Sequence, residues 1–203
     1  MHNTGMLVII SGPSGSGKGT VVKKLFDDEI GYALSISMTT RSPREGEKNG
    51  TDYFFCTEEE FIRKRNNNEL LEHAVFCGNL YGTPRDYVEQ QIALGKAVIL
   101  EIEVNGALQI KEIFPEAVLI FLIPPNIKEL ANRLKNRRTE SEETIQDRLR
   151  RAREEIELIE EYDYLVVNDE IKNATNSINC IVKAEYLKPL RQKAFITGLE
   201  ESE

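Results

Sequence analysis

The chain has 203 residues, of which 40% are hydrophobic and 30% charged, as is typical of a globular protein. This length allows one sizeable core with room for a smaller inserted lobe. The 26 Lys and Arg residues are outnumbered by 34 Asp and Glu residues, which gives a net charge of −8. That balance argues against a broad basic face, so we expect neither nucleic acid nor a membrane as a partner. A polyanionic ligand would need a local basic site.

No targeting or membrane segment is expected. The first residues lack the basic segment and long apolar stretch of a signal peptide, and the longest apolar run, residues 117–123, is too short to span a bilayer. The cysteines, Cys56, Cys77 and Cys180, are odd in number and form no CxxC pattern. They are typical of reduced, buried thiols, with metal binding a weaker alternative, and we therefore expect a cytoplasmic protein.

Apolar runs along the chain predict strands that alternate with helices. Residues 6–10 form a short β-rich run, and apolar residues then recur at helical spacing through residues 20–26. The runs at residues 97–100, 118–123 and 165–167 are continuous, as expected for strands covered on both faces. This order predicts an α/β fold with a parallel sheet. The later helix-like segments are residues 106–113, 127–137, 141–161 and 174–186.

One helix-like segment, residues 141–161, carries apolar side chains at intervals of four and three, which form a single stripe. Core packing is the preferred interpretation of this stripe, and a coiled-coil interface is the alternative. The acidic run at residues 154–161 is interpreted as a solvated helix face. The sequence leaves the oligomeric state open, a homo-oligomer included.

The middle of the chain is polar and rich in turn residues, and it interrupts the α/β pattern. We predict that residues 37–87 form a lobe inserted into a core made of residues 1–36 and 88–203. Within the lobe, Thr57 and Glu60 have the spacing of a capping box, which predicts the start of a helix.

Residues 12–20, GPSGSGKGT, nearly match the phosphate-binding pattern G-x4-GK-[ST]. Glycines let backbone N–H groups turn inward around an anion, and the helix that follows adds its positive N-terminal end. Lys18 can bridge terminal phosphates as a point charge. The flanking strand and helix favour this interpretation over a turn without a ligand. The predicted ATP-phosphate residues are Gly12, Pro13, Ser14, Gly15, Ser16, Gly17, Lys18, Gly19 and Thr20.

A second set of phosphate-binding residue types lies in the predicted lobe. Arg41, Arg44 and Tyr53 occur in SMTTRSPREGEKNGTDYFF, where two guanidinium groups and a phenol can donate to a phosphate. Glu72 and Tyr81 follow in the string LLEHAVFCGNLYGTP.

At these residues the chain resembles the guanylate kinases. The strings SxTTRxPRxGExxGxDYxF and ExAxFxGNxYGT occur in the family's order, and the likeness continues through LEIEVNGA, RRTESEE and VVND. The resemblance implies a three-layer P-loop NTPase core with a parallel sheet, an inserted GMP-binding lobe and a lid at about residues 133–148. It also implies transfer of the terminal phosphoryl group of ATP to GMP or dGMP, with Mg²⁺ as cofactor.

By the same resemblance, one group of lobe residues holds the GMP phosphate: Arg41, Arg44, Tyr53 and Tyr81. Another group faces the guanine: Ser37, Glu72 and Thr83. A carboxylate at Glu72 can accept from the ring N–H and the exocyclic amine of guanine together, and adenine has no matching pair of donors. Thr83 stands where many relatives have serine.

An acidic pair, Glu101 and Glu103, ends the run LEIEVNG and is assigned to the GMP side of the site. Glu103 is expected either to contact the guanine or to help hold hydrated Mg²⁺; an exposed strand end is the alternative. The direct metal ligand stays open, because Gly19 takes the place after Lys18 where a metal-binding hydroxyl is usual, and Thr20 follows.

The remaining implied residues lie in the second half of the chain. Arg137 and Arg148 are expected to point at the transferring phosphate, so the expected catalytic residues are Lys18, Arg41, Arg137 and Arg148. Arg133 and Arg138 complete the local basic site, with no role assigned to Arg138. Asn168 and Asp169 occupy the place where the family receives the adenine of ATP, and a turn after a strand is the alternative interpretation.

Two other functions remain to be tested. One is a kinase of the same fold that acts on a different phosphorylated acceptor, such as AMP or a ribose phosphate. The other is a non-catalytic module that binds phosphopeptides, which the intact phosphate loop makes the weaker alternative.

Overall fold

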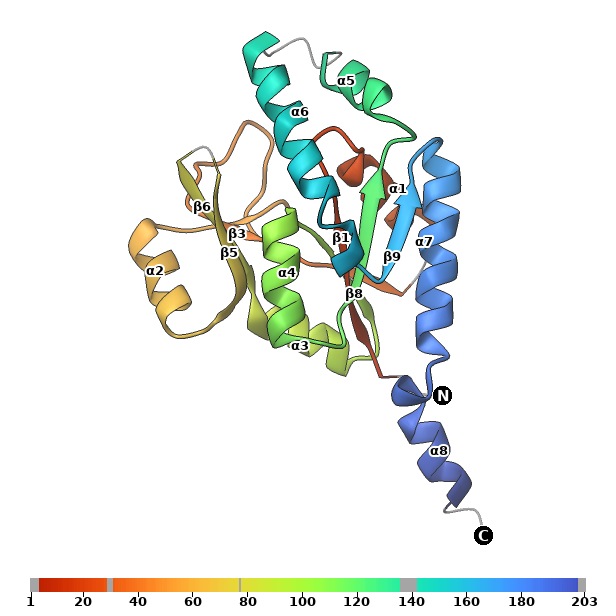
Figure 1. Cartoon of the computed structure of the whole chain (residues 1–203). Coiled ribbons are helices and arrows are strands. Elements are labelled where there is room, and N and C mark those ends of the chain that lie inside the picture. Colours follow the sequence, from red (N-terminus) through yellow and green to blue (C-terminus); the bar gives the residue numbers. More distant parts are fainter. Residues whose placement is uncertain (1–3, 29–30, 77, 136–141, 201–203) are drawn as a thin grey trace.

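The computed structural model describes residues 4–28, 31–76, 78–135 and 142–200. Three of the residues named above lie outside this part of the chain: Cys77, Arg137 and Arg138. The described residues form two sheets together with the helices that pack on them (Figure 1).

The centre of the molecule is a five-stranded sheet. Its strands, in spatial order, are β2 (Tyr32–Leu34), β7 (Ala97–Glu101), β1 (Met6–Ser11), β8 (Val118–Ile123) and β9 (Tyr164–Val167). Each neighbouring pair is parallel, with Val8 of β1 opposite Ile99 on one side and Val118 on the other. The parallel sheet expected from the continuous apolar runs is therefore confirmed.

Helices cover both faces of this sheet. Successive side chains of a strand point to opposite faces, and in β1 both sets are apolar and need a covering layer. Even-numbered residues of β1 pack with α1 (Lys18–Asp28) and α7 (Ile171–Tyr186), and odd-numbered residues pack with α3 (Arg85–Ala93) and α4 (Val104–Ile113). Burial of each large aliphatic side chain in these layers contributes roughly 1.5–3 kcal/mol. The resulting three-layer arrangement confirms the α/β fold class.

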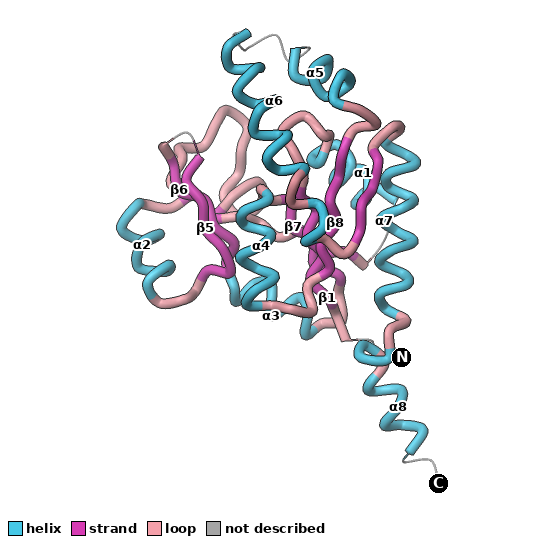
Figure 2. The backbone as a smooth tube through the Cα atoms, viewed as in Figure 1, coloured by secondary structure: helices cyan, strands magenta, loops and turns pink. Residues whose placement is uncertain are grey.

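A smaller four-stranded sheet lies beside the core. Its strands, in spatial order, are β4 (Phe54–Phe55), β3 (Met38–Thr39), β6 (Asn79–Pro84) and β5 (Leu70–Phe76). The helix α2 (Glu58–Asn66) covers one face and buries Phe61, and its N-cap Thr57 accepts a hydrogen bond from the backbone N–H of Glu60 at 3.2 Å. Leu71 of β5 shares a core with α4, which lies between the two sheets (Figure 2).

Two helices stand above the carboxyl ends of the central strands: α5 (Ile127–Lys135) and α6 (Glu142–Ile156) (Figure 1). The apolar stripe of α6 packs against α5, which confirms core packing for the buried part of that stripe. The predicted helix over residues 141–161 is too long, because α6 ends at Ile156 and a short 3₁₀ helix follows at Ile159–Glu161.

The C-terminal segment leaves the core through a 3₁₀ helix, Pro189–Arg191, and ends in α8 (Lys193–Glu200), which projects away from the body (Figure 1). Buried Arg191 anchors this segment by donating from Nη2 to the backbone carbonyl of Glu116 at 2.9 Å. Within the described residues, no helix combines the length and apolarity that crossing a bilayer requires.

The cysteines differ from expectation. Cys56 and Cys180 are both free thiols, but Cys180 is exposed, so the prediction of a buried thiol is wrong there. The reason is its place on α7, where Ile178 and Val182 face the core and Cys180 points outward.

Candidate active site

The loop between β1 and α1 has a conformation that requires glycine at two positions in particular. Gly12 and Gly17 have φ values of 138° and 93°, a region that other residues rarely adopt. A Cβ on Gly12 would lie 2.2 Å from the carbonyl oxygen of Leu122, and one on Gly17 would lie 2.4 Å from Nδ2 of Asn168. The loop therefore packs directly against the carboxyl ends of β8 and β9.

Lys18, the first residue of α1, folds back over this loop. Its side chain is only 9% exposed, and Nζ donates to the carbonyl oxygens of Gly12 at 2.6 Å and Pro13 at 3.3 Å. The first N–H groups of α1 have no acceptor within the helix, as at every helix start. Lysine and helix start together provide a compact positive site for phosphate.

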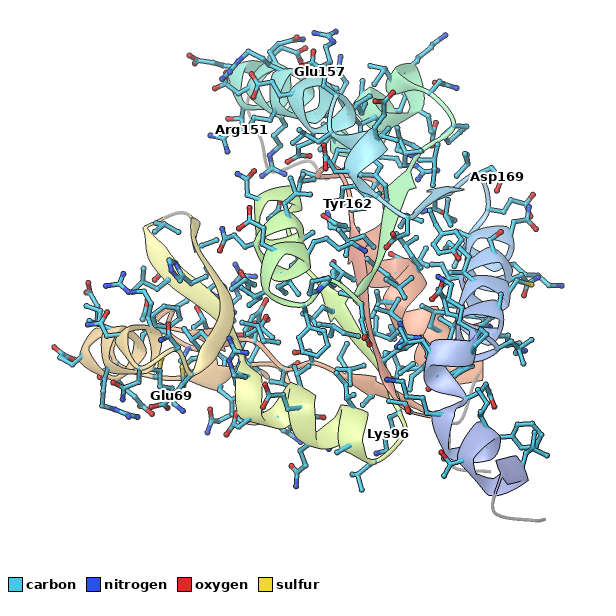
Figure 3. All side chains as sticks on the ribbon, turned by 60° about the horizontal axis from the view of Figure 1, so that its bottom comes forward. Glu69, Lys96, Arg151, Glu157, Tyr162 and Asp169 are labelled. Atoms are coloured by element: carbon cyan, nitrogen blue, oxygen red, sulfur yellow. The ribbon has the colours of Figure 1, made fainter. Side chains whose placement is uncertain are left out.

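Three residues from the second half of the chain form hydrogen bonds to this loop. The carbonyl oxygen of Ser16 accepts from Nδ2 of Asn168 at 2.7 Å and from Nη1 of Arg133 at 3.4 Å. Arg148 of α6 donates from Nη1 to the hydroxyl of Ser14 at 3.0 Å. Asp169 is exposed at the N-terminal end of α7, where its carboxylate accepts from the backbone N–H of Glu170 (Figure 3).

Acidic side chains border Lys18. Glu101 is exposed at the end of β7, but partial desolvation of its carboxyl raises its pKa, and the charge of Lys18 opposes this rise. A Cβ on Gly19 would lie 3.4 Å from Oε2 of Glu101, so the absence of a side chain at Gly19 leaves that carboxylate beside the loop. Glu103, in contact with solvent, adds a negative charge that further raises the pKa of Glu101.

Glu155 of α6 belongs to the same acidic group, although the sequence analysis took it for part of a solvated face. Burial and then the charge of Glu103 raise its pKa to about 7, and the charge of Lys18 opposes this rise. That interpretation was wrong because Glu155 is one turn from buried Ala152, on the side of α6 that faces the core. The regular three-residue spacing from Ala152 is the signal that could have found it.

In the smaller sheet, Arg41 is held by aromatic rings and by one carboxylate. Its guanidinium lies 5.3 Å from the ring centroid of Tyr53 and 5.8 Å from that of Phe55. Nη2 donates to both oxygens of Glu47, at 2.9 and 3.0 Å, and this contact raises the pKa of Arg41. The Tyr53 and Tyr81 rings meet edge to face with centroids 6.0 Å apart.

Glu47 is a site residue that the sequence analysis did not single out. Besides binding Arg41, it accepts from the backbone N–H of Arg44 at 2.7 Å, and both contacts lower its pKa. Arg44 itself is exposed on this turn. The sequence signal is the position of Glu47 in the same short turn as Arg41 and Arg44, since a carboxylate can accept hydrogen bonds from a guanidinium through both oxygens.

Deeper in the same sheet, Glu72 forms a buried pair with Thr83. Glu72 is 6% exposed, and its Oε1 accepts from the Thr83 hydroxyl at 2.8 Å. Burial raises the pKa of Glu72 to about 7, and the hydrogen bond from Thr83 opposes this rise. The other oxygen, Oε2, would lie 3.0 Å from a Cβ on Gly106 of α4. Ser37 is half-buried just before β3.

Glu101 connects the two halves of the site. Desolvation raises the pKa of Glu101, and the charge of Lys18, beside the phosphate loop, opposes this rise. Burial raises the pKa of Tyr53, just before β4, and the charge of Glu101 adds to that rise. The arrangement brings a donor loop and an arginine–tyrosine group together at the carboxyl ends of parallel strands, where α/β sheets bind ligands. Fold and site together define the class of P-loop nucleotide-binding proteins.

Comparison with known proteins identifies the family within that class. The family model described as guanylate kinase matches residues 4–185. The guanylate kinase of Oceanobacillus iheyensis is 54% identical over 184 residues, which are 91% of this chain and 89% of that protein. The guanylate kinase of Bacillus subtilis is 52% identical over 189 residues, 93% of either chain.

A solved structure agrees with these sequences. The crystal structure of guanylate kinase from Anaplasma phagocytophilum superposes with a TM-score of 0.75 at 36% identity, covering 93% of this chain and 90% of that one. The chain belongs to the guanylate kinase family.

Proposed function

We propose that this chain is an ATP:GMP phosphotransferase, which transfers the terminal phosphoryl group of ATP to GMP or dGMP and releases ADP and GDP. The observation that carries this proposal is the buried pair of Glu72 and Thr83, because a buried carboxylate beside a hydroxyl matches the donors and the oxygen on one edge of guanine. Arg41 and the two tyrosines near it supply a phosphate site within the same sheet.

The donor side consists of the loop and the residues around it. Backbone N–H groups of the loop and Lys18 bind the phosphates of ATP. Asn168 and Asp169 follow β9 directly, and Asn168 bonds to the loop at Ser16. We place both residues on the nucleoside side of the ATP site. The proposed ATP-binding residues are Gly12, Pro13, Ser14, Gly15, Ser16, Gly17, Lys18, Gly19, Thr20, Asn168 and Asp169.

The acceptor side consists of the smaller sheet and the acidic pair. Arg41 offers a planar pair of donors to the GMP phosphate, which Arg44 and the tyrosines complete. The full set of proposed GMP-binding residues is Ser37, Arg41, Arg44, Tyr53, Glu72, Tyr81, Thr83, Glu101 and Glu103.

Hydrated Mg²⁺ fits the acidic side of the loop. Mg²⁺ prefers oxygen ligands and is usually held by one or two carboxylates together with substrate phosphates, and Glu101 lies beside Gly19 at this place. Within the described residues, no cluster of three or more metal-ligating side chains would hold a metal without the nucleotide. We propose that Glu101 and Glu103 hold Mg²⁺ through its waters, and that the ion neutralises negative charge on the phosphates.

The transfer itself needs alignment and charge neutralisation more than acid–base chemistry. Lys18 holds the donor phosphates and Arg41 holds the acceptor phosphate. Arg148, which already bonds to Ser14 of the loop, reaches the phosphates from the lid side, and Arg137 acts from the same segment. The proposed catalytic residues are Lys18, Arg41, Arg137 and Arg148. Approach of lid and lobe would exclude water and so prevent hydrolysis of ATP.

For the division of the chain we propose a core of residues 1–36 and 88–203, a GMP-binding lobe of residues 37–87 and a lid at about residues 133–148. The separate apolar clusters of the smaller sheet and of the α5–α6 pair support this division. A cytoplasmic location and a homo-oligomer stay predictions, as does the lack of a nucleic-acid partner.

An acceptor panel tests the proposed function. ATP and Mg²⁺ are incubated with GMP, dGMP, AMP, UMP or ribose 5-phosphate, and the products are separated by chromatography. We expect GDP and dGDP to form far faster than any other diphosphate. Preferred phosphorylation of AMP or a ribose phosphate would overturn the assignment of the acceptor, and no product with any acceptor would overturn catalysis.

A further inference from the structure

The amide nitrogen of the Asn168 side chain is hydrogen-bonded to the phosphate loop. Asn168 is only 3% exposed, and Nδ2 donates to the carbonyl oxygen of Ser16 at 2.7 Å across a sequence separation of 152 residues. The same nitrogen lies 2.4 Å from where a Cβ on Gly17 would be, so the amide rests directly on the loop backbone. The amide is buried against the loop and does not project from the surface.

Arg133 of α5 reaches the same loop carbonyl from the other side. Nη1 donates to the carbonyl oxygen of Ser16 at 3.4 Å, and Nη2 donates to the backbone carbonyl of Asn168 at 3.0 Å. Nε donates to Glu129, one turn earlier on α5, at 2.8 Å, which fixes the plane of the guanidinium. A planar guanidinium, with five donors in a fixed geometry, can bond two carbonyls and a carboxylate at the same time.

The geometry of the peptide bond gives these contacts a consequence for ligand binding. In a planar trans peptide the C=O and the following N–H point in opposite directions. Holding the Ser16 carbonyl outward, against Asn168 and Arg133, therefore turns the N–H of Gly17 toward the inside of the loop. Inward N–H groups are what a phosphate-binding loop offers to an anion.

We propose that Asn168 and Arg133 are positioning residues for the phosphate loop, and that the Asn168 side chain contributes to donor binding through the Ser16 peptide and not by reading adenine. This inference rests on the proposed function only in taking ATP as the phosphoryl donor. Because the effect passes through the loop, it acts on the phosphates of a donor whatever base the donor carries.

Binding measurements separate this role from base recognition. The full chain is titrated with a fluorescent ATP analogue, and ATP and inorganic tripolyphosphate are then used to displace it. For Asn168→Ala we expect the affinities for ATP and tripolyphosphate to fall by the same factor, about tenfold. Loss of ATP affinity with unchanged tripolyphosphate affinity would overturn the proposal, and so would unchanged affinity for both.

Matched variants keep the test independent of folding. Asn176→Ala removes an exposed asparagine amide from α7 and should change neither affinity. Arg133→Met, on a partly exposed residue, should lower both affinities, and combining it with Asn168→Ala should cost less than the product of the single effects. Multiplicative losses would mean that the two residues act independently, which contradicts a shared action on Ser16.

The same samples separate this inference from the proposed function. If the unaltered chain binds ATP and tripolyphosphate but forms no GDP, the proposed function fails while the positioning role can still be measured. The positioning role alone fails if the unaltered chain forms GDP but Asn168→Ala lowers the affinity for ATP and not that for tripolyphosphate.

Discussion

Glu72 illustrates how the surroundings of one residue prepare it for a particular partner. Its carboxylate is buried and accepts one hydrogen bond, from Thr83, in a space that Gly106 leaves open. Burial raises its pKa to about 7, so the ionised form gains stability from each further donor that reaches it. A base that presents two adjacent N–H donors satisfies this carboxylate, whereas adenine leaves it unpaired.

Replacing this carboxylate by an amide should reduce selectivity. In Glu72→Gln the acceptor for two donors becomes a mixed donor and acceptor, so kcat/KM for GMP should fall about 100-fold, as two charge-assisted hydrogen bonds weaken. The preference for GMP over AMP should shrink with it. Thr83→Ser, which keeps the hydroxyl, serves as the control and should retain the preference. Unchanged discrimination in Glu72→Gln would remove Glu72 from the base site.

The pKa of Glu72 also predicts a pH dependence. Because the pKa is raised from 4.5 to about 7 in the folded chain, the contribution of Glu72 to the free energy of unfolding is fully present below pH 4.5 and is lost as the pH rises through 7. GMP needs the ionised carboxylate, so its affinity should increase over the same range. Calorimetric titration between pH 5.5 and 8 checks this, with Glu72→Gln as control for ionisation of the phosphate. Equal pH slopes for both proteins would contradict it.

Glu47 should act on GMP through Arg41. Glu47→Gln weakens the two-oxygen contact with the Arg41 guanidinium and the bond to the Arg44 backbone, so the phosphate site loses its fixed geometry. We expect KM for GMP to rise about tenfold, as for the loss of one charge-assisted bond, with a smaller change in KM for ATP. Glu69→Gln weakens the ion pairs of Glu69 with Arg63 and Lys64 of α2 and should leave both constants unchanged. An equal change in KM for GMP in Glu47→Gln and Glu69→Gln would show that Glu47 has no specific role in the phosphate site.

Among the structural elements, the unit of β1, loop and α1 depends on glycine for two different reasons. At Gly12 the positive φ and the nearby Leu122 carbonyl exclude any side chain. At Gly19, inside the first turn of α1, the nearest atom to a Cβ would be Oε2 of Glu101 at 3.4 Å, an ordinary contact distance. The two glycines of one motif therefore differ in what they tolerate.

Alanine at these positions should have opposite effects on stability. Gly12→Ala should lower the free energy of unfolding by at least about 2 kcal/mol, because the strained backbone and the clash act together. Gly19→Ala should leave stability unchanged or raise it by up to about 1 kcal/mol, as alanine favours a helix over glycine. Denaturant unfolding of the two variants measures both effects. Similar stabilities for the two variants would contradict the role of the loop conformation.

The elements also mark how far sequence reasoning could reach. Continuous apolar runs predicted β1, β7 and β8 well, because burial on both faces leaves a strong local pattern. The run at β9 also predicted a strand, but Leu165 and Val167 are exposed, so β9 is not covered on both faces as expected. The aromatic string YFFC at residues 53–56 indicated β4, but the two-residue strand β3 carries no such pattern, since its pairing is set by tertiary contacts. β2 and α3 were not identified as elements, for the same reason.

For the candidate site, the residues that motifs name could be proposed from the sequence, and their partners could not. Lys18 and Arg41 belong to recognisable strings, but the Asn168–Ser16 contact joins residues 152 positions apart. The spacing of Glu155 from Ala152 indicates the inner side of α6, but its neighbours Glu103 and Lys18 are distant in the sequence. Such partners are fixed by packing, which only the folded chain defines.

At the scale of the whole molecule, the acidic chain concentrates positive groups where a nucleotide phosphate would lie. The net charge is −8, yet Lys18 and Arg148 both bond to the phosphate loop, and Arg41 follows β3 of the smaller sheet. Under the proposed function, the core, the lobe and the lid each supply one cation to the transfer.

The rate of ADP release in a coupled assay tests this account most directly. With ATP and Mg²⁺ alone, we predict negligible ADP, since the donor phosphate meets neither an acceptor nor an ordered water. Adding GMP should start rapid release, with one GDP formed for each ADP, and adding AMP in its place should not. ADP release that is the same with and without GMP would contradict the claim that the loop and the smaller sheet bind ATP and GMP for direct transfer.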